Sequence, residues 1–435
     1  MELSTINYSK FINTVNSRRR PMITRELTKQ VYNATGPVIS LAEGMPNAQT
    51  FPFDSINFSL KDGSSFSIEG EELDMALQYL PTQGHPKLIK CLKDFHCRIH
   101  RPPVWHRSDL IITNGSQEGI SRVIEMCIEE GDSVIVQNPL YSGTAIILNP
   151  YKPELIPIDQ DEFGIKPTML RRVLKQRKKL SMTNKNIKMP KLMYLNPTGA
   201  NPTGTVMTLE RKQAVYKIAC EYNILILEDE AYQFLHFMEH IPPSFQSMDT
   251  EGRVLRFDSL SKIVSSGLRI GWVSGPKELI HAIELQMQAG CLHPSSLSQT
   301  LAYKLLNHWG YDGFMARMES IQDYYRVRRD ITIAAMERHL TGLCYWSVPD
   351  AGMFVWIEVL GLTDVYDMLM TFGIKKGIVF VPGHAFMADS DQACNFIRAS
   401  FSKVDPEKID SAMASLAQLI REEQERLRLK LENCT

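Results

Sequence analysis

The sequence predicts an α/β protein, with a large domain built on a mainly parallel sheet and a smaller α+β domain. From about residue 108, short β-type runs alternate with helical patterns, which is typical of a parallel sheet covered by helices on both faces. After a long helical stretch at 313–341, a second and shorter group of strands and helices follows. A chain of 435 residues is long enough for one large domain and one smaller one.

The large domain is predicted from the periodicity of its apolar residues. In 116–132 and 208–223 they recur on one helical face, which indicates helices. The run ILILE at 224–228 has four apolar residues in succession, as in a strand buried on both faces. Further strands are expected at 109–113, 133–137, 191–195, 253–259 and 269–275, and a further helix at 276–288.

The small domain is predicted from the last part of the chain. Strands are expected at 353–359, 377–382 and 395–401, with helices near 363–376 and from about 405. We therefore expect three regions along the chain. They are an N-terminal arm with part of the small domain (1–60), a large cofactor-binding domain (61–320) and the C-terminal small domain (321–435).

The charge balance gives no reason to expect nucleic acid or a membrane as a partner. The chain has 48 Lys and Arg against 49 Asp and Glu, a net charge of −1. No apolar run approaches the roughly 20 residues that a membrane span needs. The basic stretch at 175–191 has no interleaved aromatic residues, and we interpret it as a solvated loop.

The cysteine and histidine pattern indicates neither disulfides nor a metal site. Eight cysteines are scattered without a CxxC pair, which favours a reduced, intracellular compartment. The cluster HCRIH at 96–100 stands alone, so we assign it a structural role and expect no metal. Residues 7–29 are rich in Ser, Asn and Arg and poor in acids. They read equally as a mitochondrial transit peptide or as a folded basic arm, and we expect the mitochondrial matrix rather than the cytoplasm.

Polar residues gather where the predicted strands end, the edge at which α/β sheets bind ligands. The turn NGSQEG at 114–119 places Ser116 and Gln117 at the start of a helix, where free backbone amides form an anion site. The loop NPTGANPTGT at 196–205 has prolines that stiffen it and glycines that turn it, and it would hold Asn201 in a fixed orientation.

A buried strand ends in three acids, Glu228, Asp229 and Glu230, and Tyr232 follows soon after. Acids at a buried strand end need partners, and we expect one of them to cap a helix.

Lys262 completes this set, in the stretch DSLSKIVSSGLRIGW. A free lysine amine is normally charged and non-nucleophilic, so a lysine in this setting suggests Schiff-base chemistry with an aldehyde. Ser259, Ser261 and Arg269 offer hydroxyls and a planar cation, which suit a phosphate. An aldehyde that carries a phosphate is pyridoxal phosphate, and we predict it as the cofactor.

The chain resembles the fold-type I, class-I aminotransferases. The motifs NPTG, DEAY, SLSK with an arginine seven residues later, and the arginine of NFIRASF occur in the family's order. From Tyr8 to about residue 425 the pattern is most similar to the branch that acts on kynurenine and 2-aminoadipate with 2-oxoglutarate. The resemblance implies the fold-type I arrangement of a large cofactor domain and a small domain.

The resemblance also implies roles for individual residues around the cofactor. Lys262 would carry the cofactor covalently, Asp229 would hold the pyridine nitrogen protonated, and Asn201 and Tyr232 would bind the phenolic oxygen. Tyr141 would stack on the ring. The phosphate would be held by Ser116, Gln117, Ser259, Ser261 and Arg269.

The implied substrate site draws on both ends of the chain. Arg398 would bind the substrate α-carboxylate, and Asn201 would also contact the substrate. Arg25 on the N-terminal arm would contact the substrate side chain, with Gly44 nearby. Tyr79 would reach the cofactor phosphate of the neighbouring subunit and contact the substrate there, so the resemblance implies a homodimer with active sites at its interface. The partners would be an amino acid donor and a 2-oxo acid acceptor.

The sequence departs from this branch at two places. Glu43 stands where a glycine is usual, and a carboxylate there would disfavour acidic substrate side chains. The segment EDEAYQF replaces a Pro-Tyr-Tyr pattern but keeps the Asp-x-x-Tyr spacing of the wider family. The cofactor assignment therefore stands, and the substrate assignment is weakened.

Three alternative functions share some of these residues. A β-lyase acting on cysteine conjugates would use the same fold and cofactor. A ligand-sensing transcription regulator needs a DNA-binding domain, but the roughly 40 residues before ISLAEGMP have no helix-turn-helix pattern. A cofactor-free Schiff-base aldolase would use Lys262 and leave Asp229, Arg269 and Asn201 without a role.

Overall fold

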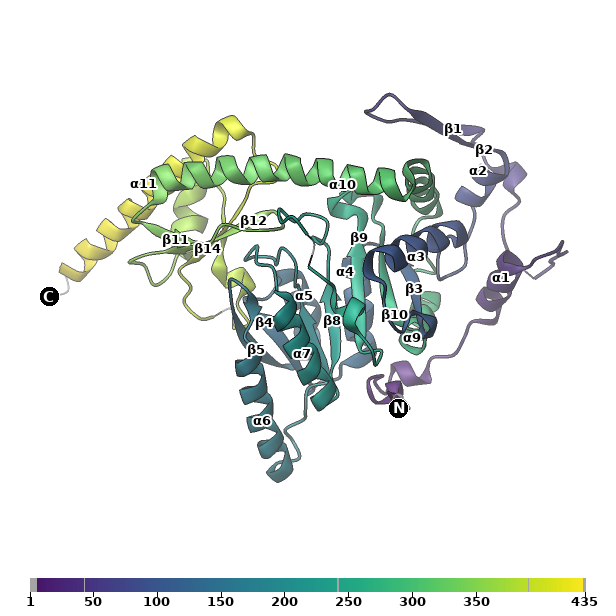
Figure 1. Ribbon diagram of the computed structural model, residues 1–435, viewed down its shortest axis with the longest axis horizontal. Coiled ribbons are helices and arrows are strands. Elements are labelled where there is room, and N and C mark those ends of the chain that lie inside the picture. The colour runs from purple at the N-terminus through teal and green to yellow at the C-terminus, as the bar shows by residue number, and fades with distance from the viewer. Residues whose placement is uncertain (1–5, 43, 241, 390, 433–435) are drawn as a thin grey trace. The chain divides into compact units, whose positions relative to one another are not determined.

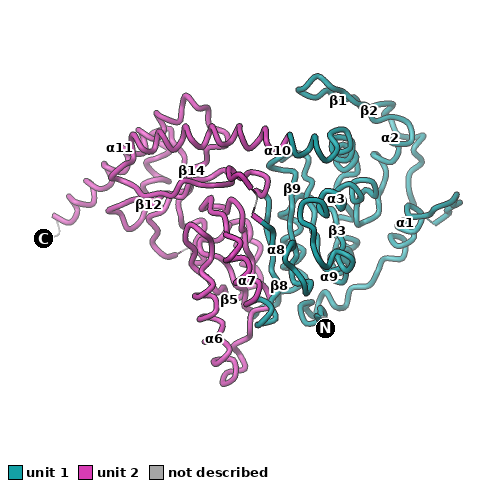
Figure 2. The backbone as a smooth tube through the Cα atoms, viewed as in Figure 1, with its two compact units in different colours: residues 1–132, 219–231, 243–316 teal, residues 133–218, 232–242, 317–435 magenta. Residues whose placement is uncertain are grey.

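The computed structural model describes residues 6–42, 44–240, 242–389 and 391–432. The chain forms two compact units (Figure 2). Unit 1 comprises Met1–Asp132, Ala219–Ala231 and Pro243–Ala316, and unit 2 comprises Ser133–Ile218, Tyr232–Pro242 and Arg317–Thr435.

Unit 1 is built on four strands in the order β3-β10-β9-β8 (Figure 1). Strands β8 and β9 are parallel, and β10 is antiparallel to both of its neighbours. All four coincide with strands predicted from the sequence, to within two residues at each end. They are β3 (Ser108–Thr113), β8 (Leu225–Asp229), β9 (Val254–Ser259) and β10 (Gly271–Pro276).

Helices cover these strands because one face of each helix is apolar. Helix α4 (Ser116–Cys127) packs closely on the sheet, since a Cβ at its Gly119 would lie 2.6 Å from a methyl of Val273. Helix α9 (Lys277–Ala289) lies where the sequence predicts it. The other helices are α1 (Ile23–Asn33), α2 (Gly70–Ala76), α3 (Pro86–His100) and α8 (Phe245–Met248).

The sequence analysis missed a hairpin in unit 1. Strands β1 (Ser55–Ser59) and β2 (Ser65–Glu69) pair antiparallel. Their residues are about half polar, and their apolar contribution is a small cluster around Ile68 and Leu73.

Unit 2 contains two groups of strands. The first group has the order β7-β4-β5-β6, with β4 parallel to β5 and β7. The second is an antiparallel sheet with the order β11-β12-β14-β13. The first group consists of β4 (Ser133–Asn138), β5 (Glu154–Asp161), β6 (Gly164–Ile165) and β7 (Leu192–Leu195). The second consists of β11 (Cys344–Trp346), β12 (Phe354–Val359), β13 (Val381–Pro382) and β14 (Phe396–Ser400).

The antiparallel sheet buries one face against helices. Ile357 and Ala399 share a core with Leu416 and Ile420 of the last helix. The helices of unit 2 are α5 (Ser142–Leu148), α6 (Pro167–Thr183) and α11 (Pro406–Glu432). Two helices run from one unit into the other along the chain, α7 (Leu209–Tyr222) and α10 (Ser296–Leu340), and α10 is interrupted at Gly310.

Three predictions for unit 2 need correction. The stretch 175–191 is not a loop throughout, because residues up to Thr183 form the second half of α6, anchored by the buried Leu170 and Leu174. The helix expected near 363–376 is a π-helical segment (Met368–Gly373) followed by a 3₁₀ turn (Ile374–Lys376). The strand expected at 377–382 is reduced to β13.

The structure gives the HCRIH cluster a packing role. His96, on α3, is 4% exposed and stacks on Trp105 with ring centroids 4.7 Å apart. Across the four described stretches of the chain, His, Cys, Asp and Glu side chains form no group of three that could hold a metal ion. None of the seven described cysteines forms a disulfide with another described residue. Within those same stretches, every helix is too short or too polar to cross a membrane.

Burial of His96 should make stability depend on pH. Burial, with the charge of Arg256 acting in the same direction, lowers the pKa of His96 to about 3, whereas an unfolded histidine has a pKa near 6.5. The unfolded state therefore binds a proton at His96 that the folded state does not bind. The free energy of unfolding consequently decreases as the pH falls from 6.5 towards 3. Between pH 7 and pH 5, we expect His96 to lower the free energy of unfolding by about 2 kcal/mol.

The test compares urea unfolding of the wild type and of His96→Phe at both pH values. The phenylalanine keeps an aromatic ring against Trp105 and has no proton to bind. The variant should lose about 2 kcal/mol less than the wild type on acidification. Equal losses in the two proteins would contradict the assignment.

Candidate active site

A cradle of hydrogen-bond donors forms in unit 1, where the turn before α4 meets the loop before β10. Gly115 has φ of 79°, and a Cβ there would lie 2.3 Å from Nη2 of Arg269. Only glycine leaves room for the guanidinium at this turn. A Cβ at Gly271 would lie 2.5 Å from the backbone nitrogen of Ser116, so β10 also approaches the start of α4 closely.

Arg269 and two serines complete this cradle. Nη1 of Arg269 donates to Oγ of Ser261 at 3.3 Å, and Nη2 donates to the carbonyl of Asn114 at 3.0 Å. The backbone N–H of Ser261 donates to Oγ of Ser259 at 3.1 Å. The first amides of α4, at Ser116 and Gln117, lie at the positive end of the helix dipole. An arginine, hydroxyls and helix amides form the donor set that a phosphate monoester requires.

Asp229 and Lys262 belong to the same edge of the unit 1 sheet. Asp229 is the last residue of β8 and is 5% exposed. Lys262 ends the 3₁₀ turn Leu260–Lys262 that directly follows β9. Because β8 and β9 are parallel neighbours, their carboxyl ends lie at one edge of the sheet, where ligands bind in α/β proteins.

The sequence analysis missed a buried ion network on the neighbouring positions of these strands. Arg256 on β9 is fully buried and donates to both carboxylate oxygens of Asp258, at 2.9 and 2.8 Å. Its Nη1 lies 3.3 Å from Oε2 of Glu228. Burial raises the pKa of the Asp258 carboxyl, and the charge of Arg256 opposes that shift. Glu228 also accepts from the backbone amides of Phe245 and Gln246 at the start of α8, which confirms that one of the three acids caps a helix.

In unit 2, the NPTG loop is held by close backbone packing. A Cβ at Gly199 would lie 2.6 Å from the backbone nitrogen of Gly352. The backbone N–H of Asn201 donates to Oδ1 of Asn196 at 2.7 Å. Asn201 is 5% exposed, and its side-chain oxygen accepts from Nη1 of Arg398 at 2.9 Å. The predicted pair Asn201 and Arg398 is therefore brought together.

Aromatic rings surround the Arg398 guanidinium. Its carbon lies 4.4 Å from the ring centroid of Phe354 and 5.0 Å from that of Phe386. Tyr232 packs edge-on against Phe354 at 5.8 Å. Burial lowers the pKa of Arg398, and the charges of Tyr232 and Tyr141 act against this shift. Its buried Nε has no hydrogen-bond partner among the described residues, so the guanidinium keeps a donor for an incoming carboxylate.

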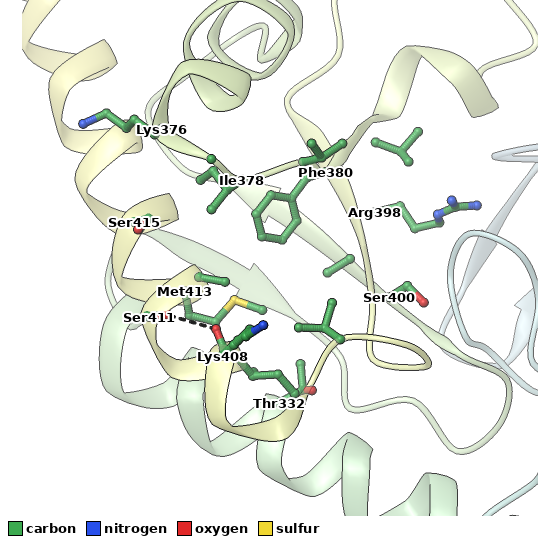
Figure 3. A pocket seen from close by; sticks show the side chains of 17 residues that line it. Thr332, Lys376, Ile378, Phe380, Arg398, Ser400, Lys408, Ser411, Met413 and Ser415 are labelled. Atoms are coloured by element: carbon green, nitrogen blue, oxygen red, sulfur yellow. Dashed lines mark hydrogen bonds between the residues drawn. The ribbon is translucent and has the colours of Figure 1, made fainter.

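A separate pocket of about 480 Å³ lies behind the strand that carries Arg398. Figure 3 shows the guanidinium turned away from the apolar side chains of this pocket, such as Phe380 and Met413. Of the predicted site residues, Arg398 alone contributes to its lining. The pocket is therefore distinct from the site that the guanidinium faces.

The remaining predicted site residues have varied surroundings. Arg25, on α1, is 7% exposed; its Nε donates to Oγ1 of Thr82 at 3.2 Å, and its Nη2 donates to the carbonyl of Leu80. Burial lowers the pKa of Arg25. Tyr79 is 47% exposed, with its ring edge-on to His293.

The other substrate-side residues have open or aromatic surroundings. Gly44 has open space where a Cβ would stand, and Glu43 lies outside the described residues. The ring of Tyr141 covers Gly143 in unit 2.

Comparison with known proteins identifies what the chain is similar to. Residues 38–416 match the family model described as aminotransferase class I and II. The mitochondrial kynurenine/alpha-aminoadipate aminotransferase of Bos taurus is 41% identical over 423 residues, covering 96% of this chain and all of that protein.

Two solved structures extend the similarity to three dimensions. Aminotransferase Aro8 from Candida albicans superposes with a TM-score of 0.84 at 25% identity, covering 97% of this chain and 99% of that one. Kynurenine aminotransferase from Pyrococcus horikoshii, solved in complex with PMP, superposes with a TM-score of 0.77 at 31% identity, covering 96% and 98%.

Proposed function

The chain belongs to the class I and II aminotransferases and is a pyridoxal phosphate-dependent enzyme, and from this premise we propose its substrates. The donor is kynurenine, 2-aminoadipate or a related aromatic or long-chain amino acid, and the acceptor is 2-oxoglutarate. The observation that carries this proposal is Arg398, a cation with a free donor beside the rings of Phe354 and Phe386. The name of the bovine relative supports the same donors.

In this proposal, unit 1 holds the cofactor. The amides of Ser116 and Gln117, the hydroxyls of Ser259 and Ser261 and the Arg269 guanidinium bind the phosphate. Bound pyridoxal phosphate supplies an electron sink for the bond broken at the substrate Cα. The Asp229 carboxylate holds the proton on the pyridine nitrogen. Lys262 Nζ takes the proton from Cα and later returns one.

The residues of unit 2 are proposed to orient the ring and the substrate. Asn201 and Tyr232 bind the phenolic oxygen, and Tyr141 stacks on the ring. Arg398 donates two parallel hydrogen bonds to the α-carboxylate, while the Asn201 amide keeps its guanidinium in place. Fixing the carboxylate presents the Cα–H bond in one orientation to the base.

Replacing Arg398 with lysine should raise KM for amino donors about ten- to hundredfold. The ammonium retains the charge but loses the planar fork, and a hydrogen bond to a charged group is worth about 1.5–3 kcal/mol. Steady-state kinetics with kynurenine measures the change. Arg329→Lys is the matched control, because Arg329 also lies over an aromatic ring of unit 2, 4.7 Å from the centroid of Phe237. Equal KM values for the wild type and Arg398→Lys would remove Arg398 from the site.

The enzyme is further proposed to be a homodimer of the mitochondrial matrix. Tyr79 is 47% exposed, which leaves it accessible to the cofactor phosphate of a partner subunit. The relative's printed name supports the mitochondrial location. The size of the protein in solution by light scattering tests the dimer, and the location of a C-terminal fluorescent fusion tests the compartment.

The N-terminal arm is proposed to serve the substrate site through Arg25 and Gly44. Deleting residues 1–29 should lower kcat/KM for both kynurenine and 2-aminoadipate and leave a stable dimer. An arginine can pair with a carboxylate or stack on an aromatic ring, so its loss affects both donors. Equal kcat/KM values in the truncated and full-length proteins would contradict this role and favour the interpretation of the arm as a transit peptide.

A panel of amino donors with 2-oxoglutarate tests the proposed function. Loss of the visible absorption of the enzyme reports the first half-reaction, and formation of glutamate reports the second. Kynurenine and 2-aminoadipate should be among the best donors. Release of pyruvate and ammonia from cysteine conjugates, without glutamate formation, would favour the β-lyase alternative.

A further inference from the structure

One segment of unit 2 has a charge unlike that of the whole chain. Residues 163–209 contain three arginines, seven lysines and no aspartate or glutamate, although the net charge of the protein is −1. The remainder of the chain is therefore acidic. The net charge of the whole chain does not reveal this basic segment. The expectation that no anionic partner binds therefore applies to the chain as a whole and not to this segment.

Most of this positive charge lies on and just after helix α6. The helix is anchored by the buried Leu170 and Leu174 and by Arg177, which donates to both carboxylate oxygens of Glu154 at 2.6 Å. Figure 1 shows α6 extending beyond strands β4 and β5 of the same unit. Arg172, Lys175 and Lys179 are consequently held on an anchored helix, and Lys185 lies just after its end.

We define the α6 surface by four exposed cations and one exposed apolar residue. The cations are Arg172, Lys175, Lys179 and Lys185, and no ion pair with an acid is found for them among the described residues. Met182, in the last turn of the helix, is 77% exposed, and its spacing places it on the same stripe of α6 as Arg172, Lys175 and Lys179. A stripe of cations with an exposed apolar side chain suits a helix that lies on a lipid surface.

The composition of the segment favours lipid over nucleic acid. Single-stranded nucleic acids are bound by aromatic side chains that stack on bases, and residues 164–193 contain no Phe, Tyr, Trp or His. The Met182 side chain has no use on a phosphate backbone, whereas it can enter the boundary between headgroups and acyl chains. Each lysine or arginine near an anionic bilayer strengthens binding roughly fivefold.

We propose that the α6 surface docks the enzyme on a membrane that carries anionic phospholipids. The helix lies along the headgroups, the four cations contact the lipid phosphates, and Met182 enters the interface. The attraction is screened by salt over about 8–10 Å. The site does not use any residue assigned to the cofactor or substrate, so docking leaves the basal activity unchanged.

The test is co-sedimentation of the full-length holoenzyme with two kinds of vesicle, pure phosphatidylcholine and phosphatidylcholine mixed with phosphatidylglycerol. The wild type should bind the anionic vesicles alone and be released as salt is raised. Reversing Arg172, Lys175, Lys179 and Lys185 to glutamate should lower the partition coefficient at least about a hundredfold. Met182→Ser should lower it severalfold at unchanged charge.

A matched control separates this surface from net charge. Reversing Lys10, Lys61, Arg317 and Lys403, which are also exposed, changes the total charge by the same amount and should leave vesicle binding as in the wild type. Unchanged aminotransferase activity and circular dichroism establish that both variants fold.

Three outcomes would overturn the proposal. They are equal binding of the wild type to both vesicles, equal loss of binding in the two charge-reversal variants, and binding of a polyuridine oligonucleotide in preference to anionic vesicles.

Discussion

Replacing Lys262 with alanine should abolish transamination, with a loss of at least about ten-thousandfold in kcat, because no other group takes over its proton transfer. The protein should fold normally. Lys262 sits in a short turn after β9 and is only partly buried, so its removal leaves no cavity in the core. Single-turnover kinetics with kynurenine measures the loss, and thermal unfolding checks the fold.

A second lysine serves as the control for this variant. Lys277 starts helix α9, where its Nζ donates to the carbonyl of His106 at 2.9 Å. Lys277→Ala removes the same side chain from the surface of the same unit and should keep the activity of the wild type. Measurable turnover in Lys262→Ala, above that of the cofactor alone in solution, would exclude Lys262 as the base.

Replacing Asp229 with asparagine should retain the cofactor and reduce kcat on the order of a thousandfold. In the proposed site the phosphate is held by other groups, so the cofactor should stay bound. Without the carboxylate the pyridine nitrogen loses the partner that keeps it protonated, and the electron sink weakens. Breaking a buried charge pair costs several kcal/mol, and each 1.36 kcal/mol in the barrier is a factor of about ten in rate.

The neighbouring acid makes the comparison specific. Glu230 follows Asp229 directly and is also buried, at 3% exposure. Glu230→Gln makes the same chemical change one residue away and should retain most of the turnover. Cofactor content, from the visible absorption, and kcat are measured on both variants. A similar loss in both, or near-normal turnover in Asp229→Asn, would show that the pyridine nitrogen faces another group.

Strands β3, β8, β9 and β10 of unit 1 could be predicted because each is a short segment that contains apolar, β-type residues. The run 224–228 indicates a buried element, and β8 coincides with it to within one residue at each end. The hairpin of β1 and β2 was missed because its apolar residues are few. The second half of helix α6 was interpreted as part of a loop because charged residues outnumber apolar ones in the stretch 175–191. Leu170 and Leu174, four residues apart, were the signal that it packs as a helix.

The residues of the proposed phosphate site could be named from the sequence, but their arrangement in space could not. Ser259, Ser261 and Arg269 follow from their chemistry, but the close approach of β10 to α4 depends on Gly115 and Gly271. The sequence gives only a weak indication of the ion network of Glu228, Arg256 and Asp258. In RVLRFDS, the arginine and aspartate are two residues apart, on one face of a strand. That they meet Glu228 depends on strand register, which a single sequence does not specify.

Borohydride reduction of the holoenzyme, followed by peptide mapping, is the most direct test of the central claim. Reduction makes the covalent link between cofactor and lysine permanent, so the label survives proteolysis and can be located by mass spectrometry. We predict that it is found on Lys262, in the peptide between Arg256 and Arg269. A label on any other lysine, or a reduced protein from which all the cofactor can be dialysed, would contradict the account.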